Sequence, residues 1–190
     1  MEKTLIKKVH YIQLSYNNYN DIFSALKISK SLPKNRGVVI VKHANPCGVS
    51  ILRNNIDCFK YALACDPISA FGGIVSCNFK ITKTLALELD KIFFEVIIAN
   101  GFDKYALKIL KQKKNLRLID ASDFLYNDVL KFNSMNNSML IQSEDNQIFS
   151  KKNFKIVSKK KPNKSQFDKI KFNCTCERSI NCWNWIRTTE

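Results

Sequence analysis

The chain of 190 residues lacks any run of about eighteen apolar residues, which excludes a membrane-spanning helix from the expected fold. Its first residues also lack the short apolar core of a secretory signal, so we expect a cytoplasmic protein. Apolar residues still make up 45% of the sequence, which suits one domain with a buried core. The seven cysteines are odd in number and scattered, which indicates reduced, buried thiols in a reducing compartment.

Acidic residues are scarce. The sequence has 16 of them and 31 lysines and arginines, which gives a formal net charge of +15. A charge of this size is typical of proteins that bind nucleic acids. The densest basic run, residues 151–171, holds nine lysines and a single acid but no regular ladder of aromatic side chains on which bases could stack. We therefore expect a solvated face there and no nucleic-acid partner.

Helical spacing of apolar residues alternates with short apolar runs from residue 21 to residue 119. The predicted helices are Asp21–Ser31, Cys58–Ala64, Lys83–Phe93 and Lys104–Lys113, and the predicted strands are Val38–Val41, Gly73–Cys77, Val96–Ile98 and Leu116–Ile119. A turn is expected at Asn17-Asn18, before the first helix. Alternation of strands and helices predicts a layered α/β domain.

The most informative stretch is Lys42-His43-Ala44-Asn45-Pro46-Cys47-Gly48, which follows the predicted strand Val38–Val41. Ligands of open α/β sheets bind outside the carboxyl ends of strands, so we expect the chemistry at the end of this strand. Lysine and histidine can both stabilise or transfer a proton near neutral pH. A second glycine turn, from Asp66 to Gly73, ends in Gly72-Gly73, where the absence of side chains would let a ligand approach the backbone closely.

These two blocks, with Leu14–Asn18 before them and Glu95–Ala99 after them, closely resemble a known family. It is the transformylase domain of the bifunctional purine-synthesis enzyme, aminoimidazole carboxamide ribonucleotide (AICAR) formyltransferase/IMP cyclohydrolase, and the agreement runs from about Leu14 to about Lys161. The resemblance implies a cytidine deaminase-like, three-layer α/β/α domain, of which this chain would hold roughly the first half of a transformylase domain. It also implies a homodimer.

The resemblance further implies formyl transfer from 10-formyltetrahydrofolate to the 5-amino group of AICAR. By position, His43 would accept or relay the proton of that amine, and Lys42 would stabilise the charge that develops on the formyl oxygen. Asn18, Gly72 and Glu95 fall where the family contacts the nucleotide, and Phe71 lies beside the folate pocket. No metal is implied.

Simpler interpretations of the same residues stay open beside these. Gly72-Gly73 can be a plain turn, and Phe71 can be a core residue. A zinc-dependent deaminase would need His-x-Glu and a later Pro-Cys-x-x-Cys, whereas His43 is followed by Asn45 and Pro46-Cys47 has no second cysteine three residues later. The alternative from another class is a basic binding module that retains the fold without catalysis.

The chain also departs from the family pattern. The family's Arg-Tyr-Gly-x-Asn-Pro-His segment, its cyclohydrolase domain and its second transformylase half are not found, and Asn100 stands where a proline is usual. We therefore expect an incomplete or inactive fragment in three parts: an unassigned segment (1–13), a partial transformylase domain (14–172) and an aberrant tail (173–190). Read one nucleotide later, the back-translated tail resembles the family's next block, so a frame error is preferred over a zinc knuckle of Cys174, Cys176 and Cys182.

Overall fold

The structure of the protein is a computed structural model that describes residues 7–8, 13–124 and 130–143. These residues belong to two compact units, an α/β domain that reaches residue 124 and a β-hairpin at 130–143. Each unit is considered by itself. The lysine-rich run 151–171 and the predicted out-of-frame tail 173–190 lie outside the described residues.

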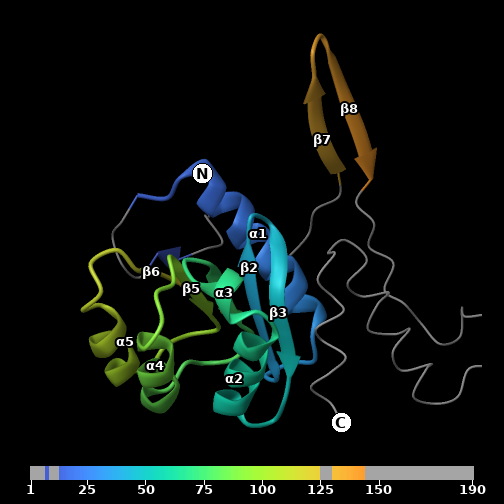
Figure 1. Cartoon of the computed structure of the whole chain (residues 1–190). Helices are drawn as coiled ribbons and strands as arrows, with labels where there is room; N and C mark the ends of the chain where they lie inside the picture. Colours follow the sequence, from blue (N-terminus) through green and yellow to red (C-terminus); the bar gives the residue numbers. More distant parts are fainter. Residues whose placement is uncertain (1–6, 9–12, 125–129, 144–190) are drawn as a thin grey trace, which may run out of the picture. The chain divides into compact units, whose positions relative to one another are not determined.

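The α/β domain is built on a six-stranded mixed sheet with the spatial order β1-β6-β5-β4-β2-β3 (Figure 1). The strands are β1 (Lys7–Lys8), β2 (Gly37–Lys42), β3 (Asn45–Ile51), β4 (Ile74–Cys77), β5 (Val96–Ala99) and β6 (Arg117–Asp120). Strands β4, β5 and β6 run parallel to one another, whereas β2 is antiparallel to both β3 and β4, and β1 is antiparallel to β6. The sheet therefore changes direction between β4 and β2.

Helices cover the two faces of this sheet and give three layers. The helices are α1 (Tyr16–Ser31), α2 (Asn55–Cys65), α3 (Pro67–Ala70), α4 (Lys83–Asp90) and α5 (Lys104–Leu110). Helix α1 packs against β2, β4 and β5 on one face, while α2, α4 and α5 gather on the other, as Figure 1 shows. The predicted α/β class and its three-layer arrangement are confirmed. Among the described residues, no helix is both long and apolar enough to cross a membrane.

The larger core lies between the sheet and α2, α4 and α5. Phe59 of α2 meets Phe94 edge-on, with ring centroids 6.1 Å apart, and both side chains are almost fully buried. Buried side chains of β2, β4, β5 and β6 complete it: Val38, Ile40, Val75, Cys77, Ile97, Ala99 and Leu118. Full burial of one large apolar side chain stabilises a fold by about 1.5–3 kcal/mol, so this layer holds the domain together.

The four predicted strands are confirmed, because β2, β4, β5 and β6 lie on the predicted runs within one or two residues. The two later helices are shorter than predicted. Helix α4 ends at Asp90 rather than Phe93, since the Phe93 carbonyl accepts the Gly72 N–H at 2.8 Å and belongs to the edge of the sheet. Helix α5 ends at Leu110 rather than Lys113, whose ammonium donates to the Ile92 carbonyl at 2.9 Å.

Two predictions about local structure were wrong. Asn17 and Asn18 form no turn before the first helix but lie in its first turn, because Ser15 caps α1 by accepting the Asn18 N–H at 3.1 Å. Strand β3 was not predicted, because Pro46 and Gly48 were interpreted as the end of a strand. Proline is compatible with β3 because this strand is at the edge of the sheet and its register with β2 shifts beside Pro46.

The second unit is a β-hairpin of β7 (Leu130–Met135) and β8 (Ser138–Ser143). The pairing of Phe132 with Ile141 and of Leu130 with Ser143 places apolar side chains on one face. That face holds Leu130, Phe132, Met139 and Ile141, all of them exposed. A two-stranded hairpin is marginally stable alone in water, so its apolar face needs cover for stability.

One carboxylate, that of Asp103, fixes the starts of two helices. It caps α5 by accepting the Ala106 N–H, and its other oxygen accepts the N–H of Lys83, the first residue of α4, at 2.8 Å. Thr82, at the N-cap position of α4, makes no side-chain cap bond. Asp103 therefore takes over that capping role. The hydrogen bond from Ala106 lowers the pKa of Asp103 below its usual range, with a smaller contribution from the Lys83 N–H.

Asp103→Asn is expected to lower the thermal midpoint near neutral pH, because the charged, two-oxygen acceptor is lost. Since the folded pKa of Asp103 lies below the unfolded value of about 3.9, its contribution is complete above that value and is lost as the pH falls through the folded pKa. Thermal unfolding of both proteins from pH 7 down to pH 2 measures this difference. A gap in midpoint that stays constant over the whole range would contradict the capping role.

Candidate functional site

Strand β2 ends in a tight turn that carries the lysine–histidine pair. Lys42 pairs with Asn45 across the β2–β3 hairpin, so His43 and Ala44 are the two residues of the loop. Both have positive φ, 54° for His43 and 60° for Ala44, as a type I′ turn requires. Left-handed backbone costs a non-glycine residue about 1–2 kcal/mol, so the turn needs support from its neighbours.

The support comes from hydrogen bonds on both sides of the turn. The Asn45 side-chain amide donates to the His43 carbonyl at 2.9 Å. Asp21 of α1 accepts the Ala44 N–H at 2.6 Å. His43 itself is exposed. The turn thus presents the imidazole to solvent from a fixed backbone.

Lys42 joins this turn to the glycine turn that precedes β4. Its ammonium donates to the Phe71 carbonyl at 2.8 Å, directly before Gly72. Gly72 has a φ of +71°, which favours glycine, and a Cβ on Gly73 would lie 2.9 Å from the Val41 carbonyl oxygen. The two glycines are therefore required by the backbone where the two turns meet.

The side chains of Asn18 and Glu95 meet although they are 77 residues apart. The Asn18 amide donates to the Glu95 carboxylate at 2.9 Å, and its oxygen accepts the Ser15 N–H at 3.2 Å as part of a capping box. Asn18 is buried and Glu95 is half-buried. This bond ties the first turn of α1 to the residue that precedes β5.

The strand register places these residues along one edge of the sheet. This edge is the row of strand ends at which β2 ends and β4 and β5 begin, and it is distinct from the outer strand β3. Val41 of β2 pairs with Ile74 of β4, which pairs with Val96 of β5. Lys42, Gly73 and Glu95 are each one residue beyond that row. The structure therefore brings Lys42, His43, Phe71, Gly72, Asn18 and Glu95 together at this edge.

Strand β2 ends at this edge, whereas β3, β4, β5 and β6 begin there, because β2 runs antiparallel to both β3 and β4. As predicted, Lys42 and His43 lie at the carboxyl end of β2. Gly72 and Glu95 lie at the same end of the sheet but come before β4 and β5.

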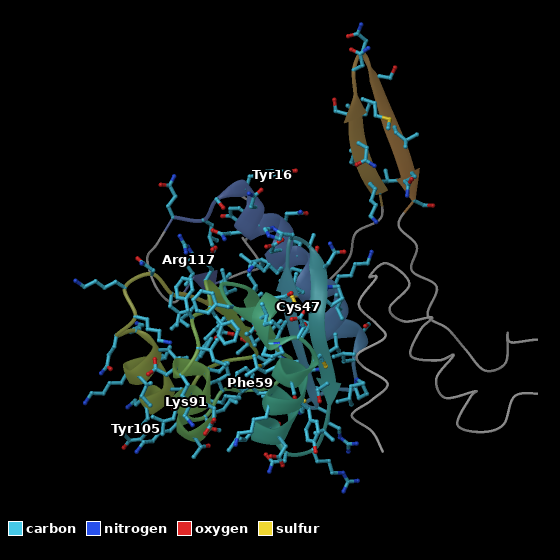
Figure 2. All side chains as sticks on the ribbon, viewed as in Figure 1. Tyr16, Cys47, Phe59, Lys91, Tyr105 and Arg117 are labelled. Atoms are coloured by element: carbon cyan, nitrogen blue, oxygen red, sulfur yellow. The ribbon has the colours of Figure 1, made fainter. Side chains whose placement is uncertain are left out.

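Two side chains at the same edge were missed in the sequence. Asp21 lies three residues after Asn18 on α1, a spacing that places both on neighbouring parts of the helix surface and could have pointed to it. Arg117, at the start of β6, donates to the Gln13 carbonyl at 3.1 Å and so fixes the segment that leads into α1. Figure 2 shows Arg117 and Tyr16 at the same end of the domain.

The thiol of Cys47 on β3 lies beside Lys42, and its pKa favours the protonated form at neutral pH. Burial raises the pKa of Cys47 to about 11, and Asp66 raises it further, while Lys42 lowers it. Burial also raises the pKa of Cys58, Cys65 and Cys77. In the part of the chain that the structure describes, no three His, Cys, Asp or Glu side chains gather as a metal site would require. The polar side chains that the structure brings together at this edge are those of Lys42, His43, Asn18 and Glu95.

Comparisons with known proteins show the family of the chain. A model of the AICARFT/IMPCHase bienzyme family matches residues 2–183. The chain belongs to this family. It is 38% identical over 172 residues to the bifunctional purine biosynthesis protein PurH of Acetivibrio thermocellus, and the match covers 89% of this chain and 33% of that protein. The PurH of Staphylococcus haemolyticus is 41% identical over 162 residues, with 85% and 33% covered.

The chain thus spans about a third of the length of these PurH relatives. Among solved structures, a putative formate dehydrogenase accessory protein from Desulfotalea psychrophila overlaps 67% of this chain and 56% of its own, with a TM-score of 0.46 and 10% identity. That overlap is too weak to bear on the fold. The assignment of the chain to the AICARFT/IMPCHase bienzyme family, whose PurH members are named for purine biosynthesis, rests on the sequence matches.

Gly73→Ala is expected to lower the free energy of unfolding by about 2–3 kcal/mol, because the new Cβ would press on backbone oxygens of β2 and α3. Gly72→Ala is the matched control, since its nearest neighbour is a Phe93 ring carbon at 3.8 Å. Its cost is the positive φ alone, about 1 kcal/mol. Urea unfolding of the three proteins gives both values, and an equal or smaller loss for Gly73→Ala would refute the close approach of the two turns.

Proposed function

We propose that this chain, which spans about a third of its PurH relatives, carries part of the site for the formyl transfer of its family, from 10-formyltetrahydrofolate to the 5-amino group of AICAR. The observation that supports this most is the hydrogen bond from Lys42 to the Phe71 carbonyl. It joins the lysine–histidine turn to the glycine turn at a single edge of the sheet. It connects two of the four blocks of family resemblance in space, and the Asn18–Glu95 bond connects the other two.

In this proposal His43 takes a proton from the amine of AICAR. An aromatic amine is a weak nucleophile, and it attacks the formyl carbon well only while a base accepts its proton. His43 is exposed on a turn whose backbone is fixed on both sides. An imidazole held in that way can meet a bound amine with little loss of freedom.

Lys42 stabilises the charge on the formyl oxygen. Attack forms a bond from the amine nitrogen to the formyl carbon, and the bond from that carbon to N10 of the folate then breaks. His43 takes the amine proton and gives it to N10 as tetrahydrofolate departs, so that the imidazole is neutral again. Between these steps the oxygen is negative, and the Lys42 ammonium beside Gly72 suits it.

We assign the nucleotide to Asn18, Glu95 and Gly72. The Asn18–Glu95 bond holds both polar groups in place before a ligand arrives, which lowers the entropy cost of binding. Gly72 presents backbone without a side chain, and a Cβ at this position would meet the Phe93 ring at 3.8 Å. A ribonucleotide can therefore approach the main chain at this turn.

We assign the folate to the side of Phe71. Its ring is 60% exposed and lies 5.5 Å from the Phe93 ring at a tilt of 49°. An exposed aromatic pair beside the Lys42 ammonium offers an apolar surface for a flat heterocycle.

The same proposal includes three further expectations: a cytidine deaminase-like fold, a homodimer, and a partial transformylase domain at residues 14–172. The alternative, a basic binding module without catalysis, is not favoured by the family match.

Calorimetric titration of the purified chain with AICAR tests the proposed nucleotide site. Gly72→Ala is expected to weaken AICAR binding by at least about tenfold, because a Cβ at this turn blocks the close approach of the ligand. Gly101→Ala is the matched control, since it also alters a positive-φ glycine, but at the far end of β5. It should bind AICAR as the unaltered chain does.

Formyl transfer from 10-formyltetrahydrofolate is measured in the same samples. His43→Ala should lower the rate by about 100-fold or more while the Kd for AICAR stays within threefold, because general bases contribute about 10²- to 10⁴-fold. An unaltered chain that fails to bind AICAR, or equal binding by Gly72→Ala and Gly101→Ala, would overturn the assignment.

A further inference from the structure

The loop that presents His43 is held by a side chain outside the family motifs described above, that of Asp21. Its carboxylate accepts the Ala44 N–H at 2.6 Å, and the two residues come from different elements, α1 and the β2–β3 loop. Asp21 is half-buried in the second turn of α1. The bond is therefore tertiary, and it reaches the backbone directly after His43.

The loop needs such a bond because its conformation is unfavourable for the residues it holds. A type I′ turn is favoured by Asn-Gly or Gly-Gly, whereas this turn has histidine and alanine at its two positive-φ positions. The Asn45 amide secures only the His43 carbonyl, on the strand side. The Ala44 N–H is secured from the helix side by Asp21.

Helix α1 also fixes where this turn lies relative to the proposed nucleotide contacts. Asn18, three residues before Asp21, is bound to Glu95 at the start of β5. One short stretch of helix thus contacts both Glu95 and the His43 loop. A rigid helix between these two points sets the distance from the nucleotide contact to the imidazole.

We propose that Asp21 is a positioning residue, which holds the His43–Ala44 turn in its positive-φ conformation and thereby directs the imidazole. Its value for catalysis rests on the proposed function. Its effect on the turn does not depend on that function, so the two can be tested apart. Asp21 acts through the backbone of Ala44 and touches no reacting group.

Amide hydrogen exchange measured by NMR tests the bond directly. In Asp21→Ala the Ala44 amide should exchange roughly 10- to 100-fold faster, because a hydrogen bond to a charged acceptor is lost. Asp21→Asn keeps an oxygen acceptor and should retain most of the protection. Asp57→Ala, which removes an exposed acid from the first turn of α2, should leave the Ala44 amide unchanged.

A rescue variant separates positioning from general stability. Ala44→Gly removes the Cβ that disfavours positive φ, so the turn should keep its conformation without the carboxylate. The ring resonances of His43, assigned against a His10→Gln protein, should shift and broaden in Asp21→Ala. They should return toward their original positions when Ala44→Gly is added, while the amides of β2 stay protected throughout.

Unchanged exchange at Ala44 in Asp21→Ala would overturn the proposal, as would a loss of protection across β2 that Ala44→Gly does not restore. AICAR titration of the same proteins addresses the proposed function separately. If the unaltered chain binds no AICAR, the proposed function fails, and the exchange and resonance data still decide the role of Asp21.

Discussion

The candidate site depends on how the first two turns of α1 are bound to one edge of the sheet. Two hydrogen bonds make this connection, Asn18 to Glu95 and the Ala44 N–H to Asp21, and a third, from Arg117 to the Gln13 carbonyl, ties the segment before α1 to β6. A single helix therefore connects the start of β5 with the β2–β3 loop, where Glu95 and His43 lie.

At the opposite edge, where β4 and β5 end and β2 begins, polar side chains form a structural hydrogen-bond network. The Asn78 oxygen accepts N–H groups of Arg36 and Gly37, and its amide donates to the Ser29 and Pro33 carbonyls. The oxygen and the nitrogen of the Asn78 side-chain amide each make two hydrogen bonds to the protein, and the residue is buried. Such a network stabilises the end of β4 and offers little to a ligand.

Asn100, which stands where the family usually has a proline, joins the same network. Its side-chain amide donates to the Asn78 carbonyl at 2.8 Å, and its oxygen accepts from Lys30 at 3.4 Å. Its backbone N–H donates to the Phe79 carbonyl at 3.2 Å, a bond that proline could not make. Burial lowers the pKa of Lys30 there. Asn100 therefore takes part in the hydrogen-bond network at the carboxyl ends of β4 and β5.

Local sequence predicted the parts of the fold that local chemistry determines. Short β-branched runs such as Val38–Val41 predict buried strands because few other conformations bury them as well. Strand β3 escaped prediction because Pro46 and Gly48 disfavour a central strand, and only the sheet order reveals that β3 lies at the edge. The direction of β2 relative to β4 could not be predicted, since a strand covered by helices on both faces is a continuous apolar run in either direction.

The same distinction applies to the site. The positions of Lys42 and His43 at the end of β2 followed from the strand pattern. The Asn18–Glu95 and Asp21–Ala44 bonds could not be predicted, because they join residues far apart in sequence through the packing of α1. The ligand-binding roles of Asn18, Gly72, Glu95 and Phe71 remain proposals.

In the proposed function, a ribonucleotide binds where β4 and β5 begin, beside the first turn of α1. Chemical-shift mapping by NMR during titration with AICAR tests it most directly. The account predicts that the largest shifts occur at Asn18, His43, Gly72 and Glu95. Largest shifts at Asn78, Asn100 and Gly101, where β4 and β5 end, would contradict it.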